Sequence, residues 1–307
     1  MVLSKEKNFY KAILSIVIPI TFQNLISVSV NMADTIMLGT LGEIELSASS
    51  IGGQLFFILM VLLMGIGSGA NVMCAQYFGK EDKININKVL SLAYLLAILL
   101  SLSCLIIALF FPKIFMMIFT SDNKVIEKGI IYMRISSLSY VFFSITMIST
   151  SVLRSIKKVK IPALINMISL IINVILNYIL ILGKFNFTPI GIKGAAIATV
   201  IARICECILI IIYIRFFENN INYRISYMHS ISEKLRRQYI KVATPIFLNT
   251  ALAADSESSV CARFKVFFYD IIILLFVHLY YILLTTFLQE YFRLRNTHLQ
   301  LTVNQMP

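Results

Sequence analysis

Residues 162–182 read PALINMISLIINVILNYILIL, an apolar run without a single charged residue. A helix that crosses a bilayer requires about 20 mostly apolar residues, and this run has that length. Lipid offers no hydrogen-bond partner to an open backbone, so such a run crosses as an α-helix. The fold of the chain follows from this segment and from others like it.

Five further runs have the same character, at residues 12–33, 51–75, 89–111, 129–152 and 192–214. None shows the alternation of polar and apolar residues that closes a membrane β-barrel. The first run keeps polar positions and lacks a small-residue cleavage pattern, which indicates a retained helix and not a cleaved signal peptide. We therefore predict an all-α polytopic membrane protein with a six-helix transmembrane bundle.

The composition of the 307 residues agrees with this class: 59% are hydrophobic and 14% are charged. Soluble domains carry roughly 25% charged residues, so an ordinary cytosolic domain is excluded. A disordered basic tail is excluded as well, because disorder requires low hydrophobicity.

The net charge of +12 indicates a topology and not a nucleic-acid ligand. The basic residues lie between the apolar runs, where no soluble basic face is available for phosphates. The N-terminus, the second and fourth connections and residues 215–241 carry 16 Lys and Arg, against 5 in the alternate connections. Cytoplasmic loops are enriched in Lys and Arg, so we expect a multi-pass protein of the cell membrane with a cytoplasmic N-terminus.

The five cysteines indicate neither a disulfide framework nor a metal site. Cys205 and Cys207 flank Glu206, but helical residues two apart do not face each other, and the tetrahedral ligand set of zinc is missing. We expect no metal, no cofactor and no enzymatic activity.

Asp34 is the first candidate for a functional residue, within the stretch NMADTIMLG at 31–39. A carboxyl group in a membrane span costs at least a few kcal/mol unless it faces a cavity or a partner. Such a group could switch between protonated and ionised forms during transport. The alternative, a position at the water interface, stays open from the pattern alone.

Asn173 and Asn177 lie four residues apart and therefore share one face of their predicted helix. Their amides require partners, either across a helix interface or in a watered cavity. Interhelical hydrogen bonding is the simpler interpretation.

Three further residues in the spans are polar or interrupt the helix. Pro19 removes a backbone hydrogen bond in the first run, so a kink there exposes a carbonyl where the helix lines a cavity. Arg203 and Glu206 are three apart in the sixth run and can pair. Whether that pair is structural or gates a path is open from the sequence.

Several motifs together resemble the multidrug and toxic compound extrusion (MATE) family of cation-coupled efflux transporters. Each is weak alone, but their order and spacing are specific, and the resemblance extends from the N-terminus to about Asn249. The matching segments are the Pro19 helix, Ala33–Gly39, Gly67–Ala70, Ala75–Lys80, Leu153–Ser155, Lys160–Pro162, Asn173–Leu180 and Pro189–Thr199.

The resemblance implies two six-helix lobes that rock around a central cavity while exchanging drugs for H⁺ or Na⁺. It implies that Asp34 is the cation-coupling carboxylate of the N-terminal lobe, with Asn173, Asn177 and Thr199 in its polar network. It also places the Pro19 kink at the cavity. Some relatives carry an Asp where Asn177 stands here, and the loss of that second carboxylate argues against a purely two-carboxylate proton relay in this chain.

The family pattern stops near the C-terminus. We expect an N-terminal six-helix lobe at 1–217, a cytoplasmic basic inter-lobe loop at 218–242, and the start of a seventh helix followed by an atypical tail at 243–307. The tail is expected to be frameshifted or fused, and its apolar run at 264–288 is a candidate seventh span. The chain thus resembles a transporter truncated after the N-terminal lobe.

The expected function is multidrug efflux by H⁺ or Na⁺ antiport, impaired by loss of the C-terminal lobe. The expected partners are lipophilic or cationic small-molecule drugs and membrane lipid, with self-association as an open alternative and without nucleic acid. A non-transporting membrane remnant or scaffold, and a flippase-like exporter of lipid-linked sugars, are the alternative functions.

Overall fold

The computed structural model describes residues 21, 25, 32–183, 188–218, 221 and 231–254. The chain divides into two compact units, Met1–Ala251 and Leu252–Pro307. The description that follows concerns the first unit. Pro19 and the tail run at 264–288 lie outside the described residues.

Within the described ranges, every regular element is helical, as the sequence predicted. Residues 32–39 form a short helical segment. The elements that follow are α2 (Glu43–Gly52), α3 (Gln54–Gly79), α4 (Lys83–Phe110), α5 (Pro112–Phe119), α6 (Asn123–Ser136), η1 (Ser137–Ser139), α7 (Tyr140–Ser155), α8 (Lys160–Leu182), α9 (Ile192–Phe216) and α11 (Glu233–Ala254).

Five segments of the described chain are long and apolar enough to cross a membrane. They correspond to five of the six predicted spans, and the remaining run at 12–33 lies almost wholly outside the described residues. All five are longer than predicted, and the two largest extensions arise because α2 continues into α3 and α6 continues through η1 into α7. The five segments are Glu43–Gly79, Lys83–Phe110, Asn123–Ser155, Lys160–Leu182 and Ile192–Phe216.

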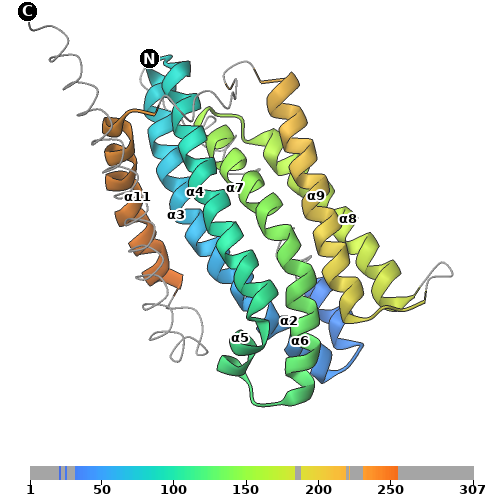
Figure 1. Ribbon diagram of the computed structural model, residues 1–307. Helices are drawn as coiled ribbons and strands as arrows, with labels where there is room; N and C mark the ends of the chain where they lie inside the picture. Colours follow the sequence, from blue (N-terminus) through green and yellow to red (C-terminus); the bar gives the residue numbers. More distant parts are fainter. Residues whose placement is uncertain are drawn as a thin grey trace, which may run out of the picture. The chain divides into compact units, whose positions relative to one another are not determined.

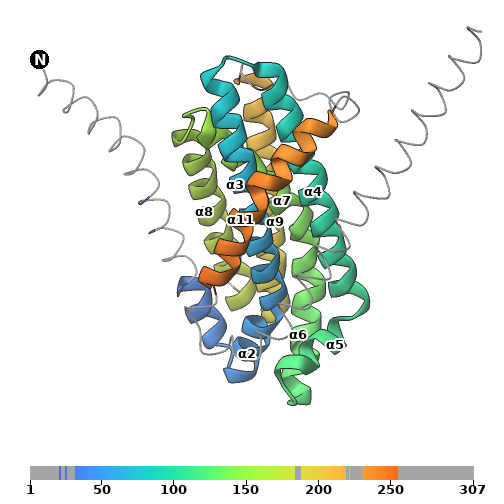
Figure 2. The ribbon, with the colours of Figure 1, turned by 90° about the vertical axis from the view of Figure 1, so that its left-hand side faces the viewer.

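The helices stand side by side in one layered bundle (Figures 1 and 2). The closest pairings are α8 with α9, α3 with α4 and α7, and α2 with α6, while α6 also packs against α9. Because the chain reverses at each connection, the α3–α4 and α7–α8 connections and the end of α9 lie at the same end of the bundle (Figure 1).

Glycines build the hairpin between α8 and α9. Gly183 ends α8 with φ of 66°, and Gly191 precedes α9 with φ of 62°, a backbone region that L side chains seldom adopt. At Gly194 an added Cβ would lie 2.8 Å from the Leu180 carbonyl oxygen, so the two helices approach closely there. The register of the polar residues on α8 and α9 depends on this contact.

Helix α11 starts earlier than the sequence predicted. It begins at Glu233, so residues 233–242, expected as part of the inter-lobe loop, are helical. Leu235 and Tyr239 are buried one turn apart, and the Tyr239 hydroxyl donates to the Ile66 carbonyl of α3. This packing across α3 (Figure 2) stabilises a helical start that is too polar to resemble a span.

Candidate functional site

The Asp34 carboxylate lies beside α8 and is bound by its amides. Asn177 Nδ2 donates to Asp34 Oδ1 at 2.7 Å, which joins two residues 143 positions apart. Asn173 and Asn177 are both buried, and Asp34 is half-buried. The structure therefore brings together three of the residues that the sequence singled out.

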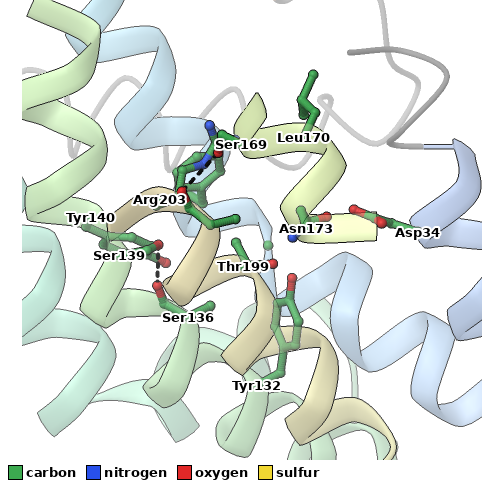
Figure 3. Close-up of a pocket in the computed structure, with 13 residues that line it drawn as sticks. Asp34, Tyr132, Ser136, Ser139, Tyr140, Ser169, Leu170, Asn173, Thr199 and Arg203 are labelled. Carbon is green, nitrogen blue, oxygen red and sulfur yellow. Dashed lines mark hydrogen bonds between the residues drawn. The ribbon is translucent and has the colours of Figure 1, made fainter. Parts of the chain in front are cut away.

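The amide of Asn173 lies at the same carboxylate (Figure 3). In one orientation its oxygen accepts from Asn177 Nδ2 at 3.2 Å. In the other orientation its nitrogen donates to both oxygens of Asp34, at 3.3 and 3.1 Å. The second orientation gives the Asn173 nitrogen both carboxylate oxygens as acceptors, with the donor Asn177 Nδ2 also 3.2 Å away, and on those two contacts we assign the Asn173 amide as a donor to Asp34.

A cavity of about 190 Å³ adjoins this cluster (Figure 3). Asp34, Asn173 and Thr199 line it together with Arg203. Drug-sized ligands occupy pockets of roughly 300–1,000 Å³, so this space is of the size for a small cation with water and not for a drug.

Thr199 lines the cavity from α9, and its hydroxyl donates a hydrogen bond within the same helix. Its Oγ1 donates to the Ala195 carbonyl at 3.0 Å, which leaves the oxygen lone pairs as acceptors at the cavity. The predicted set is thus placed as one cluster, except Pro19, which lies outside the described residues.

Sequence reasoning missed the hydroxyls that form the opposite wall of the cavity. Tyr132, Ser136, Ser139 and Tyr140 line it from α6, η1 and α7. Ser139 Oγ donates to the Ser136 carbonyl at 2.6 Å, whereas Tyr140 Oη is buried and has no hydrogen-bond partner among the described residues. The signal available in the sequence was a group of serines that interrupts an otherwise apolar run.

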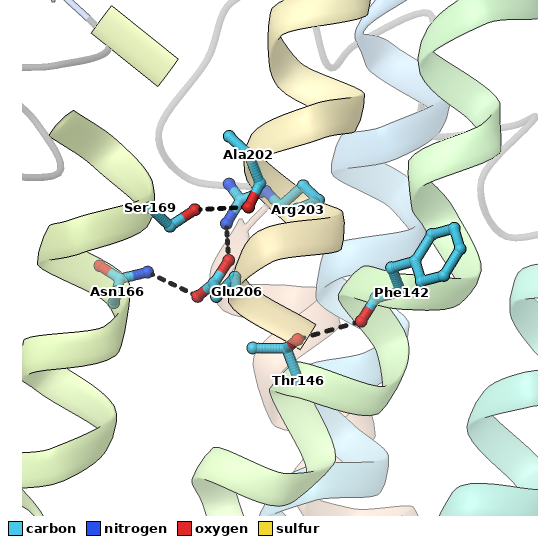
Figure 4. A network of polar contacts seen from close by, with 7 residues as sticks. All are labelled: Phe142, Thr146, Asn166, Ser169, Ala202, Arg203 and Glu206. Carbon is cyan, nitrogen blue, oxygen red and sulfur yellow. Dashed lines mark hydrogen bonds and ion pairs between the residues drawn. The ribbon is translucent and has the colours of Figure 1, made fainter. Parts of the chain in front are cut away.

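A second polar cluster lies on the same pair of helices (Figure 4). Glu206 of α9 is 3% exposed and pairs with Arg203 at 2.7 Å. Asn166 Nδ2 of α8 donates to the other Glu206 oxygen at 3.0 Å. The Arg203 guanidinium also lies 5.1 Å from the centre of the Phe143 ring, within cation–π distance.

In the part of the chain that the structure describes, no three His, Cys, Asp or Glu side chains converge as metal ligands. The carboxylates of Asp34 and Glu206 are each bound by amides, and Glu206 also by a guanidinium. The chemistry that this arrangement offers is the uptake and release of a cation at a carboxylate.

Comparison with known proteins gives consistent matches. The MatE family model matches residues 19–179. The probable multidrug resistance protein YoeA of Bacillus subtilis is 27% identical over 222 residues, covering 72% of this chain and 48% of YoeA. The probable multidrug resistance protein NorM of Thermotoga maritima is 26% identical, covering 63% of this chain and 42% of NorM. The chain thus spans about half the length of these curated relatives.

Solved structures show the same fold. A MOP superfamily transporter from Pyrococcus furiosus superposes with a TM-score of 0.71 at 21% identity, covering 78% of this chain and 52% of that one. A multidrug resistance MATE family transporter in an outward-facing conformation gives a TM-score of 0.70 with the same coverage. With a family model that matches more than half of its residues and a shared fold, this chain belongs to the MATE family.

Proposed function

We propose that this chain supplies the cation-coupling lobe of a multidrug efflux antiporter of the cell membrane. The observation that carries the proposal is the Asp34 carboxylate, held by Asn177 and Asn173 at a polar cavity inside a bundle of membrane-spanning helices. An ionisable group inside a membrane-spanning bundle is energetically costly and marks an ion or substrate path.

The chemistry of the cavity supports coupling to a monovalent cation. The Glu206 carboxylate neutralises the Arg203 guanidinium. The cavity therefore carries one net negative charge when Asp34 is ionised. A proton or Na⁺ can offset that charge, with Asn173 and Thr199 supplying neutral polar groups around it. Cation binding and release would then change the charge at Asp34.

The substrates that we propose are lipophilic or cationic small molecules, because the curated relatives are described as probable multidrug resistance proteins. The cavity beside Asp34 is too small for such a molecule, so the drug would bind elsewhere, between this lobe and a second half. Alternating access requires one half to move against another. A second copy of this chain is one candidate for that half.

We also propose that the N-terminus is cytoplasmic. The connections α3–α4 and α7–α8 and the end of α9 share one end of the bundle, and these are connections rich in Lys and Arg (Figure 1). The excess of basic residues predicts that this end faces the cytoplasm.

Ethidium efflux from cells that express this chain tests the proposal, with Asp34→Asn as the test variant. We expect efflux above the empty-vector level for wild type and its loss in Asp34→Asn, which cannot ionise. Glu127→Gln is the matched control, because this exposed carboxyl of α6 lies away from the cavity. A wild type without efflux would contradict active transport and favour a scaffold, and equal efflux in wild type and Asp34→Asn would exclude the role of Asp34.

A further inference from the structure

Glu206 is a second carboxylate buried in the spanning bundle, and the efflux proposal assigns it no role. It is 3% exposed, pairs with Arg203 and accepts a hydrogen bond from Asn166 (Figure 4). Ionisable residues in membrane spans face a cavity or a partner, and they are retained for ion paths or for paired charges. The surroundings of Glu206 decide between these two uses.

Asp34 and Glu206 each accept a hydrogen bond from an asparagine amide of α8. Among the described residues, three buried side-chain polar atoms have no hydrogen-bond partner: Tyr140 Oη, Asn166 Oδ1 and Asn177 Oδ1. Two of these are the oxygens of the amides that donate to Glu206 and to Asp34. An ionised carboxylate only accepts, whereas a protonated one also donates, and an amide serves both forms. Each carboxylate therefore has a partner ready for either protonation state.

Polar residues connect the two carboxylates along the α8–α9 interface. Asn166 bonds Glu206, and Ser169 Oγ bonds the Ala202 carbonyl at 2.9 Å, which fixes the antiparallel register of the two helices. On α8 the polar face extends about 16 Å, at 1.5 Å per residue. Its members are Asn166, Ser169, Asn173 and Asn177 on α8, and Thr199, Arg203 and Glu206 on α9.

Arg203 lies between the two carboxylates. In this register, Arg203 lies along α9 between Thr199, which lines the cavity with Asp34, and Glu206. Its guanidinium pairs with Glu206, lines the cavity with Asp34 and interacts electrostatically with Asp34. One cation thus faces two carboxylates, and the set has a net charge of −1 when both are ionised, which a membrane interior disfavours.

We propose that Glu206 is a second proton-binding carboxylate of this lobe, coupled to Asp34 through Arg203. This inference rests on the proposal that Asp34 releases a proton. When the O–H bond of Asp34 breaks, Arg203 turns from Glu206 to the new carboxylate, and the proton is taken up by a Glu206 oxygen. The number of charges is the same before and after, because the proton that Asp34 loses is the proton that Glu206 gains and Arg203 stays cationic.

The other titratable groups at this place are neutral near pH 7. Helix α9 packs against α8, α6, α7 and η1. Tyr132 of α6 and Tyr140 of α7 line the cavity, and Cys207 follows Glu206 on α9, whereas α8 and η1 contribute amides and hydroxyls. Phenols and thiols have ordinary pKa values of about 10 and 8.5. Among the described residues at the cavity, Arg203 is therefore the permanent cation that both carboxylates share.

Labelling with dicyclohexylcarbodiimide tests this coupling without any transport assay. The reagent adds to a protonated carboxyl in apolar surroundings to give an N-acylurea, which mass spectrometry locates on the peptide that contains Glu206. The full chain in lipid nanodiscs is labelled at one fixed pH. In Asp34→Asn, position 34 is permanently neutral, so Arg203 stays on Glu206 and keeps it ionised. We expect labelling of Glu206 to fall about tenfold, because the nearby guanidinium favours the charged form of the carboxyl.

Two further measurements accompany this comparison. Arg203→Gln removes the shared cation, so labelling of Glu206 should rise above the wild-type level. Glu218, a buried carboxyl near Lys158 beyond the end of α9, is the internal control, and its labelling should not respond to Asp34→Asn.

Equal labelling of Glu206 in wild type and Asp34→Asn would overturn the inference and leave Glu206 as half of a structural ion pair. The Asp34→Asn arm decides this by itself even if Arg203→Gln fails to fold. A wild type without efflux would contradict the proposed function and leave this comparison intact. If wild type shows efflux but labelling of Glu206 does not change in Asp34→Asn, only the inference that Glu206 is a second proton-binding carboxylate would be overturned.

Discussion

The Asp34 and Glu206 clusters differ in how their charge is compensated. Glu206 has a guanidinium at 2.7 Å from its own helix and an amide from α8. Among the described residues, Asp34 accepts hydrogen bonds from the amides of Asn177 and Asn173, and Asn177 lies 143 positions away in the sequence. An ion pair stabilises the ionised carboxylate, whereas amides accept either protonation state. This difference is the basis of our proposals that Asp34 changes charge and that Glu206 changes charge only when Arg203 leaves it.

The largest effect on stability should follow from breaking the ion pair. When Asp34 is protonated, Glu206→Gln leaves the Arg203 guanidinium without a carboxylate partner, and arginine cannot neutralise itself by losing a proton. Removing one partner of a buried pair costs about 3–5 kcal/mol, and because the Arg203 side chain is 22% exposed we expect about 2–4 kcal/mol. Denaturant unfolding in detergent micelles measures this loss.

The matched control for that prediction is the double variant Arg203→Gln/Glu206→Gln. With both charges removed no uncompensated guanidinium remains, so most of the lost free energy of unfolding should return. A double variant as unstable as Glu206→Gln would show that the pair stabilises through packing and not through charge.

The next largest effect should come from Gly194→Ala, at the Asp34 end of the α8–α9 interface. The added methyl meets the Leu180 carbonyl oxygen at 2.8 Å, and a backbone atom cannot move aside without shifting the helix. Overpacking of this kind costs about 1–3 kcal/mol. We expect a lower free energy of unfolding, measured on the purified variant, and reduced ethidium efflux from cells that express it.

Gly79→Ala provides the control for added volume, since nothing lies within 4 Å of the new Cβ. It should leave stability unchanged or raise it slightly, because alanine favours a helix. If Gly194→Ala behaved like Gly79→Ala, the close contact between α8 and α9 would not determine the geometry at Asp34.

The sequence predicted the five spans that the structure describes, and the Asp34 neighbourhood, for physical reasons. Spans are encoded by continuous apolar runs, and these can be read without knowing the neighbours of a residue. Asn173 and Asn177 share a face by spacing alone, and the structure places both beside Asp34. Their role in cation coupling remains a prediction, because contacts do not show ion movement.

The sequence could not predict the rest of the cavity or the start of α11. Ser139 and Tyr140 reach the cavity because η1 interrupts the span between α6 and α7, and that break depends on tertiary packing. The first turns of α11 are polar and read as a loop, yet Leu235 and Tyr239 bury one face of them. Contacts between distant segments decided both features.

A smaller effect on stability is expected for Asp34→Asn. The asparagine retains an oxygen that accepts from Asn177 Nδ2, and no ion pair is broken. Hydrogen bonds between membrane helices contribute about 0.6 kcal/mol on average, so the change should stay within about 1 kcal/mol. If Asp34→Asn also loses efflux, the Asp34 cluster would serve transport, whereas the Glu206 cluster would serve mainly the stability of the fold. A loss comparable to that of Glu206→Gln would remove the distinction between the two clusters.

A carboxylate outside the spans gives the reference for an ordinary acid, with an expected effect on stability close to that of Asp34→Asn. Asp82 caps the N-terminus of α4, and the Asn85 backbone N–H that donates to it at 3.1 Å lowers its pKa. Asp82→Ala should cost about 1 kcal/mol at neutral pH through loss of the cap.

The pH dependence at Asp82 follows from the direction of that shift. Because the folded pKa lies below the unfolded value of about 3.9, the stabilising contribution is present above pH 4 and is lost as the pH falls through the folded pKa. Asp82→Asn retains a capping oxygen and does not titrate, so it should keep most of the neutral-pH stability and lose this acid dependence. Unfolding measured from pH 3 to pH 7 compares the two, and the same acid dependence in Asp82→Asn would assign it to other carboxylates, Asp34 and Glu206 among them.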